Sequence, residues 1–261
     1  MNRLIAALLV IVLAMFGFVV TQALRVPPRR APVIAAVALD SLASATAAQQ
    51  SAGEAGLVAV RTTSLPAPVR DLAEIQRRLA SGESGTYIRE ILLQRDDNIA
   101  RWPDRQLEPL RVWIQPTSTL PDFRASYPVR AREAFERWMQ AGVPVSFTFV
   151  VDSASSEVPV TWVDRFDMPI TGRTRWTRDQ HWWIVGSSIQ VALHHQGGSS
   201  LDPEAIYAIT LHEIGHVLGL DHTMDERSIM AARVRVSQLS DLDEHTAQLV
   251  YSLPPGSVRK P

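Results

Sequence analysis

Three histidines lie within eleven residues near the C-terminus, in the run HEIGHVLGLDH that begins at residue 212. His212 and His216 are four residues apart, so on a helix they share one face and lie one turn from each other. Gly219 can adopt a positive φ at low cost, which allows the helix to end and the chain to turn back. We expect this reversal to bring His222 beside the first two imidazoles.

Three converging imidazoles suit a zinc ion. Three protein ligands leave a fourth position for water or substrate, and this arrangement is typical of a catalytic zinc site. Glu213 follows the first histidine, so it can take a proton from a zinc-bound water without being a ligand itself. A short HExxH match is common on exposed helix faces, whereas HExxHxxGxxH fixes five positions. The sequence therefore predicts His212, His216 and His222 as metal ligands and Glu213 as the catalytic residue.

The run from His212 to Thr223 resembles the zinc motif of the metzincin metallopeptidases. It is most similar to the matrixin (matrix metalloproteinase) branch, whose members have Ser or Thr after the third histidine. The segment Ser228–Met230 resembles the Met-turn of this family. By that resemblance, Met230 forms an apolar floor beneath the zinc site.

The last helix of the family is also suggested by the sequence. Leu239–Asp243, followed by Tyr251, is similar to the start and end of that helix. The family usually has two adjacent Asp residues at this point. This chain has one of them, Asp243, and Leu242 stands in the other position. This departure puts the salt bridge of the pair in question.

The resemblance implies an α+β metzincin (zincin-like) fold. We expect a twisted, mixed five-stranded sheet with two main helices, and a small C-terminal lobe with a terminal helix. The implied activity is that of a zinc metalloendopeptidase, a hydrolase that cleaves peptide bonds with zinc-activated water and Glu213 as general base. An edge strand before Ser188 would align an extended peptide substrate by backbone pairing.

Two other functions remain open from the sequence. One is a zinc-binding interaction module without catalysis, against which the intact Glu213 argues. The other is a zinc amidase that acts on cell-wall peptides.

Composition excludes several classes of function. The chain has 261 residues, a net charge of −1 and no cysteine. A near-neutral chain gives no reason to expect a nucleic-acid partner. Without cysteine there is no disulfide, no cysteine nucleophile and no cysteine switch. A latent form would therefore need another device.

The first 30 residues read as a signal or membrane anchor. Arg3 precedes an uncharged apolar run from Leu4 to Val20, which is long for a signal peptide and short for a membrane span. The positions 21–23 (TQA) make a mediocre cleavage site. We favour an uncleaved single-pass anchor over a cleaved signal, with the catalytic domain outside the cytoplasm in either case. Residues 31–68, rich in Ala, Ser, Thr, Gln, Gly and Pro, read as a linker.

Residues 69–100 read as a small N-terminal extension, either a docking subdomain or a prosegment that lies in the cleft. Val69–Ala80 has helical spacing, and Tyr87–Leu93 fits either a strand or a short helix. Asp96 and Asp97 can be read as a carboxylate latch on the zinc or as ordinary turn residues, and we favour the turn.

Residues 101–254 are the expected catalytic domain. Asp202 and Pro203 predict the start of the zinc helix, as N-cap and first helical residue. Alternation and helical spacing predict the other elements, in order strand, helix, then four strands: Leu110–Gln115, Val129–Ala141, Val145–Val151, Val158–Val163, Arg173–Thr177 at the edge and Ser188–Leu193.

The remaining conspicuous residues have less specific readings. We interpret His194 and His195 as surface histidines or substrate contacts rather than a second metal site, although His181 is nearby in the sequence. Asp221 could brace a ligating imidazole. Acidic loops of the calcium-binding kind are missing, so calcium is possible but unsupported. We expect His245 to face solvent. Three tryptophans are expected in the core or in the wall of the cleft: Trp176, Trp182 and Trp183.

Overall fold

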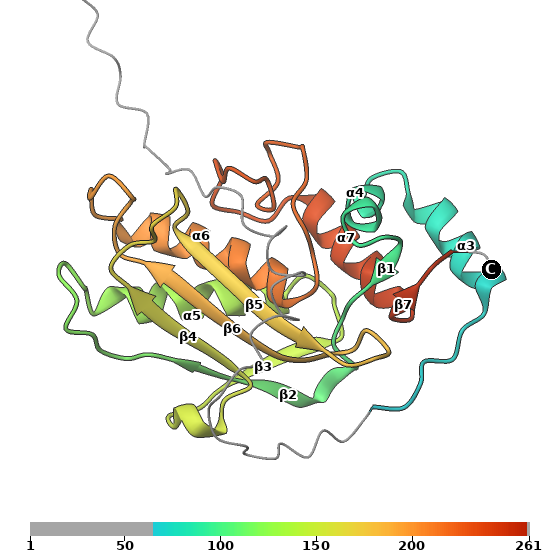
Figure 1. Cartoon of the computed structure of the whole chain (residues 1–261), viewed down its shortest axis with the longest axis horizontal. Coiled ribbons are helices and arrows are strands. Elements are labelled where there is room, and N and C mark those ends of the chain that lie inside the picture. Colours follow the sequence, from blue (N-terminus) through green and yellow to red (C-terminus); the bar gives the residue numbers. More distant parts are fainter. Residues whose placement is uncertain (1–64, 260–261) are drawn as a thin grey trace, which may run out of the picture. The chain divides into compact units, whose positions relative to one another are not determined.

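A mixed five-stranded sheet forms the framework of the protein (Figure 1). The structure is a computed structural model, and it describes residues 65–259. The strand order is β3-β2-β4-β6-β5, with β5 antiparallel at the edge and the other neighbours parallel. The strands are β2 (Arg105–Ile114), β3 (Val145–Phe149), β4 (Val158–Val163), β5 (Gly172–Arg178) and β6 (Ile184–Ala192).

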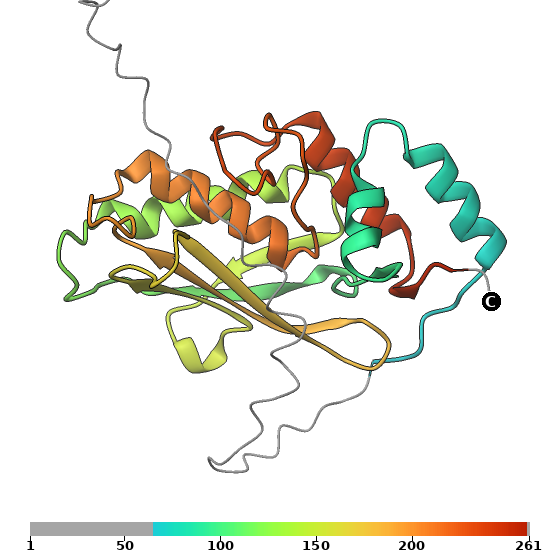
Figure 2. The ribbon, with the colours of Figure 1, turned by 45° about the horizontal axis from the view of Figure 1, so that its top comes forward.

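Two helices, α5 (Ser126–Met139) and α6 (Pro203–Val217), cover one face of this sheet (Figure 2). The alternating residues of β4 explain the contact, because Val158, Val160 and Trp162 are buried while their neighbours are not. Trp138 of α5 is fully buried, and its indole N–H donates to the carbonyl oxygen of Leu211 at 2.8 Å. The two helices are therefore joined by both packing and a hydrogen bond.

The start of α6 is as predicted. The Asp202 side chain accepts a hydrogen bond from the Ala205 backbone N–H at 2.8 Å, and Pro203 is the first helical residue. Helix α5 begins three residues earlier than predicted, because Pro128 falls in its first turn, where its missing N–H needs no partner. The predicted α+β architecture, with a five-stranded mixed sheet, is confirmed.

The N-terminal and C-terminal segments of the described chain lie side by side at one end of the sheet (Figure 1). They form α3 (Leu72–Gly82), α4 (Ile88–Gln94), α7 (Asp241–Ser252), β1 (Asn98–Ile99) and β7 (Gly256–Ser257). The segment Tyr87–Leu93, for which a strand was the alternative, is thus mostly helical. Strands β1 and β7 pair antiparallel, which joins the predicted extension to the tail.

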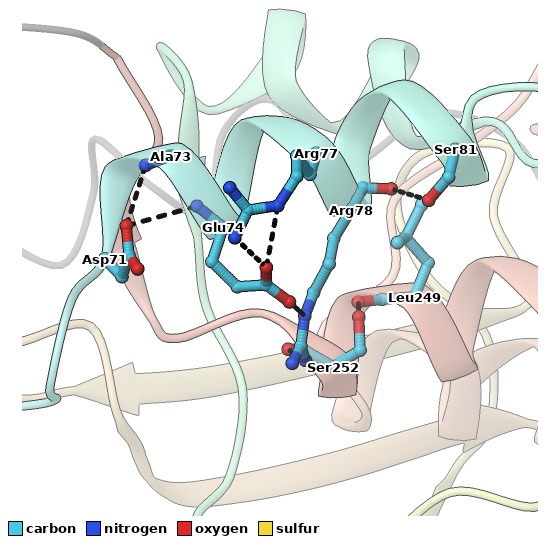
Figure 3. Close-up of polar contacts among 8 residues, drawn as sticks. All are labelled: Asp71, Ala73, Glu74, Arg77, Arg78, Ser81, Leu249 and Ser252. Carbon is cyan, nitrogen blue, oxygen red and sulfur yellow. Dashed lines mark hydrogen bonds and ion pairs between the residues drawn. The ribbon is translucent and has the colours of Figure 1, made fainter.

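Helix α3 shows how the extension is attached (Figure 3). Asp71 caps its first turn by accepting from the N–H groups of Ala73 and Glu74 at 2.9 and 3.2 Å. Arg78 donates to the carbonyl oxygen of Ser252, at the end of α7. The capping aspartate explains why the helix begins after Val69, the residue at which it was predicted to start.

The predicted anchor at residues 1–30 and the linker up to residue 64 lie outside the described residues. Between residues 65 and 259, no helix is both long enough and apolar enough to cross a membrane.

Candidate metal centre

The three histidines of the motif converge in the structure. His212 and His216 lie on α6, and Gly219 has a φ of +91°, which reverses the chain after the helix. The Nε2 atom of His212 lies 3.1 Å from Nε2 of His216 and 3.2 Å from Nε2 of His222. One ligand atom from each residue falls within 4.8 Å of the others. The three imidazoles therefore converge, as the spacing of the motif predicts.

Backbone carbonyls fix the two helical imidazoles. Nδ1 of His212 donates to the carbonyl oxygen of Ile229 at 2.6 Å, and Nδ1 of His216 donates to that of Leu220 at 2.9 Å. Because a carbonyl only accepts, the proton sits on Nδ1 and the Nε2 lone pair is turned toward the centre.

The electrostatic environment keeps these rings neutral. Burial lowers the pKa of His212 to about 3, and it also lowers the pKa of His216 and of His222. Neutral imidazole is the form that binds a metal. Lone pairs that face one another repel unless a cation lies between them, so the site fits a zinc ion with three nitrogen ligands.

Glu213 lies next to this cluster, and its residue is only 2% exposed. The Thr174 hydroxyl, from edge strand β5, lies 2.7 Å from Oε2 of Glu213 and 3.0 Å from its carbonyl oxygen. A Cβ at Gly172 would overlap the carboxylate, so the strand can approach this closely only with glycine there. The sequence did not single out Thr174. Strand alternation, which puts it on the same face as Gly172, was the available signal.

The Met-turn lies against the same helix. Met230 is fully buried, and its sulfur occupies the space that a Cβ at Gly215 of α6 would need. Thr223, the residue after the third histidine, donates its backbone N–H to the carbonyl oxygen of Met230 at 3.0 Å. The turn is thereby linked to both the helix and the His222 segment.

Comparison with known families agrees with this geometry. The sequence model described as Matrixin matches residues 115–252, which is more than half of the chain. The chain belongs to the matrixin family. Its members are zinc metallopeptidases that act on proteins or peptides. The chain has no match among the curated proteins.

In this matrixin, Asp243 holds the Met-turn in place. Its fully buried carboxylate accepts from the hydroxyl of Ser228 and, at 3.1 Å, from the N–H of Ile229. It also accepts from the N–H and the hydroxyl of Ser240 at 2.9 and 2.6 Å, which completes a capping box at the start of α7. The position that Leu242 replaces is not needed for these contacts. Asp243 therefore joins α7 to the turn without a second acidic residue at position 242.

Three aspartates have partners that the sequence did not predict. Asp221, which from the sequence could brace an imidazole, forms an ion pair with Arg95, with Nε and Oδ2 2.6 Å apart. Asp96 and Asp97 both pair with Arg259 and have positive φ values of 52° and 58°. The hypothesis that Asp96 and Asp97 form a carboxylate latch on the zinc is therefore wrong, and the prediction that they are turn residues is confirmed.

The reading of His194 as a surface histidine is wrong. Its side chain is 6% exposed and lies between two carboxylates, with Nε2 2.9 Å from Asp122 and Nδ1 2.8 Å from Asp164. His181 and His195 are half-buried, and His245 is exposed as expected. The three tryptophans are half-buried, consistent with a wall position: Trp176, Trp182 and Trp183. Within residues 65–259, no second group of three His, Asp or Glu side chains could hold a metal.

The position of His194 between Asp122 and Asp164 leads us to expect that the stability of the protein depends on pH. The hydrogen bond to Asp122 raises the pKa of His194, and Asp164 acts in the same direction. A pKa raised by folding gives stability that is complete below the unfolded value of about 6.5 and is lost as pH rises through the folded value. We expect the thermal unfolding midpoint of the wild type to fall toward that of His194→Gln between pH 6 and 9, with chelator present. The exposed His245→Gln is the control, and a constant difference between wild type and His194→Gln would contradict the assignment.

Proposed function

We propose that this matrixin is a zinc-dependent endopeptidase in which His212, His216 and His222 hold the catalytic zinc and Glu213 is the general base. The observation that supports this most is the convergence of the three Nε2 atoms, together with the burial of Glu213, which directly follows the first of these histidines. When bound, zinc would lower the pKa of a coordinated water and polarise the carbonyl group of the substrate.

The protein's own groups would carry the proton. Glu213 accepts the proton of the attacking water and then delivers it to the departing amine. The hydroxyl of Thr174 holds one oxygen of that carboxylate, which fixes the plane in which the proton is received. Burial of Glu213 excludes bulk water from this transfer.

Strand β5 is the proposed platform for the substrate. Among the described strands it pairs only with β6, so its outer backbone groups face away from the sheet. An extended peptide can add to such an edge by main-chain hydrogen bonds and continue past both ends of the strand. This geometry favours cleavage within a chain over removal of terminal residues.

We also propose that residues 101–254 form the catalytic domain and that it works outside the cytoplasm. Matrixins are typically extracellular. Membrane anchoring or secretion would depend on the apolar N-terminal segment, which lies outside the described residues.

The test is cleavage of a fluorogenic peptide library by the purified full chain. We expect internal cleavage that a zinc chelator abolishes and added zinc restores, with one zinc per chain by mass spectrometry. Activity only on cell-wall fragments would replace the proposal with an amidase. Stoichiometric zinc without hydrolysis of either substrate would replace it with a non-catalytic interaction module.

A further inference from the structure

Helix α4 contacts the segment that carries the third histidine. Gln94 donates its side-chain N–H to the carbonyl oxygen of His222 at 2.9 Å. Glu90 accepts from the hydroxyl of Thr223 at 3.1 Å and from the backbone N–H of Met224 at 2.8 Å. Three consecutive residues of this segment are therefore bonded to one helix that lies more than a hundred positions earlier.

An adjacent buried ion pair strengthens this connection. Arg95, directly after α4, contacts Asp221 through two nitrogens, with Nε–Oδ2 at 2.6 Å and Nη2–Oδ1 at 2.9 Å. The two side chains are only 7% and 10% exposed. A two-point arginine–carboxylate contact fixes orientation as well as distance. The same guanidinium lies 5.2 Å from the centre of the Trp176 ring on β5.

His222 needs such support more than the other two histidines. His212 and His216 lie on α6, whose backbone sets their positions. His222 comes after the reversal at Gly219 and lies outside any helix or strand. Its position therefore depends on contacts from elsewhere in the fold. Helix α4, with Arg95 directly after it, supplies contacts to His222 and to the residues on both sides of it.

The extension that carries α4 is firmly attached on its other side. Ile88 and Ile91 of α4 are buried in the main core, and the N–H of Tyr87 donates to the hydroxyl of Thr246 in α7 at 3.1 Å. The β1–β7 pairing and the Arg78–Ser252 hydrogen bond (Figure 3) tie the extension to the C-terminal tail. Release of this extension would expose core side chains and leave the buried Asp221 without its partner.

We propose that α4 is a permanent brace for the third zinc ligand, and that Glu90, Gln94 and Arg95 are positioning residues for His222. This inference rests on the proposed function, because it concerns the same ligand set. It assigns residues 69–100 to the working enzyme and not to a prosegment that is removed.

The first test is zinc binding by the full chain carrying Arg95→Leu. We expect zinc affinity, measured by chelator competition, to fall about tenfold or more, as is usual when a group that orients a metal ligand is lost. The visible absorption of the cobalt-substituted protein should also change, because it reports the ligand geometry. The matched control is Arg105→Leu, which removes an arginine from a partly buried pair with Glu157. At equal folded fraction, the control should keep wild-type zinc affinity and cobalt absorption.

A second variant avoids damage to the fold. Gln94 is exposed, so Gln94→Glu removes the donor to His222 without opening the core. We expect a loss of zinc affinity of about three- to tenfold, the usual effect of one hydrogen bond. Wild-type affinity and cobalt absorption in both Arg95→Leu and Gln94→Glu would overturn the inference. If the wild type itself binds no zinc, the proposed function fails with it; if the wild type binds and cleaves while both variants match it, only the brace fails.

The length of the active species gives an independent test. Mass spectrometry of the full chain, incubated with zinc until activity is constant, should find residues 69–100 retained in the active form. Activity that appears only after cleavage between residues 95 and 115 would overturn the proposal.

Discussion

Replacement of Glu213 by glutamine is expected to lower kcat/KM by roughly 10²- to 10⁴-fold, the usual contribution of a general base. Glutamine has the shape of glutamate and can still accept the hydrogen bond from Thr174, but it cannot take a proton from water. Zinc binding should persist, because the three imidazoles are unchanged. The measurement is cleavage of a fluorogenic peptide, together with zinc content of the same sample.

A matched control lies in the same helix. Glu204 is in the first turn of α6, and its side chain is 55% exposed. Glu204→Gln should leave kcat/KM and zinc content unchanged. Substantial peptide cleavage by Glu213→Gln would refute its role as base, and loss of zinc from that variant would show that the carboxylate helps to hold the metal.

Replacement of Asp243 by alanine is expected to lower the free energy of unfolding by about 3–5 kcal/mol, since each buried donor left without a partner costs about 1–3 kcal/mol. The donors come from Ser228, Ile229 and Ser240, and the carboxylate that they share is fully buried. The measurement is urea unfolding with a chelator present, so that metal binding does not contribute.

The same variant should also weaken zinc binding. Asp243 fixes the N–H of Ile229, and the carbonyl oxygen of that residue orients the His212 ring. Asp241→Ala, an exposed change in the first turn of α7, is the control and should cost less than about 1 kcal/mol. An Asp243→Ala protein within about 1 kcal/mol of wild type would contradict the anchoring role.

The spacing of residues along the chain was sufficient to predict those features whose physical cause involves residues close together in the sequence. Spacing of four along a helix placed His212 beside His216, and a glycine that tolerates positive φ allowed the reversal toward His222. Alternation predicted the strands of the sheet, because one face of a strand is buried and the other is not. The boundaries were less certain, as at α5, where a proline fits inside the first turn.

The sequence by itself determined the family, the zinc motif and the kind of fold. Only the tertiary structure decided which charged side chains are partners: Asp243 with the Met-turn, His194 with Asp122 and Asp164, and Arg95 with Asp221. The reason is physical. Helix and strand periodicity link residues a few positions apart, whereas a partner such as Arg95, 126 positions before Asp221, is chosen by how whole elements pack.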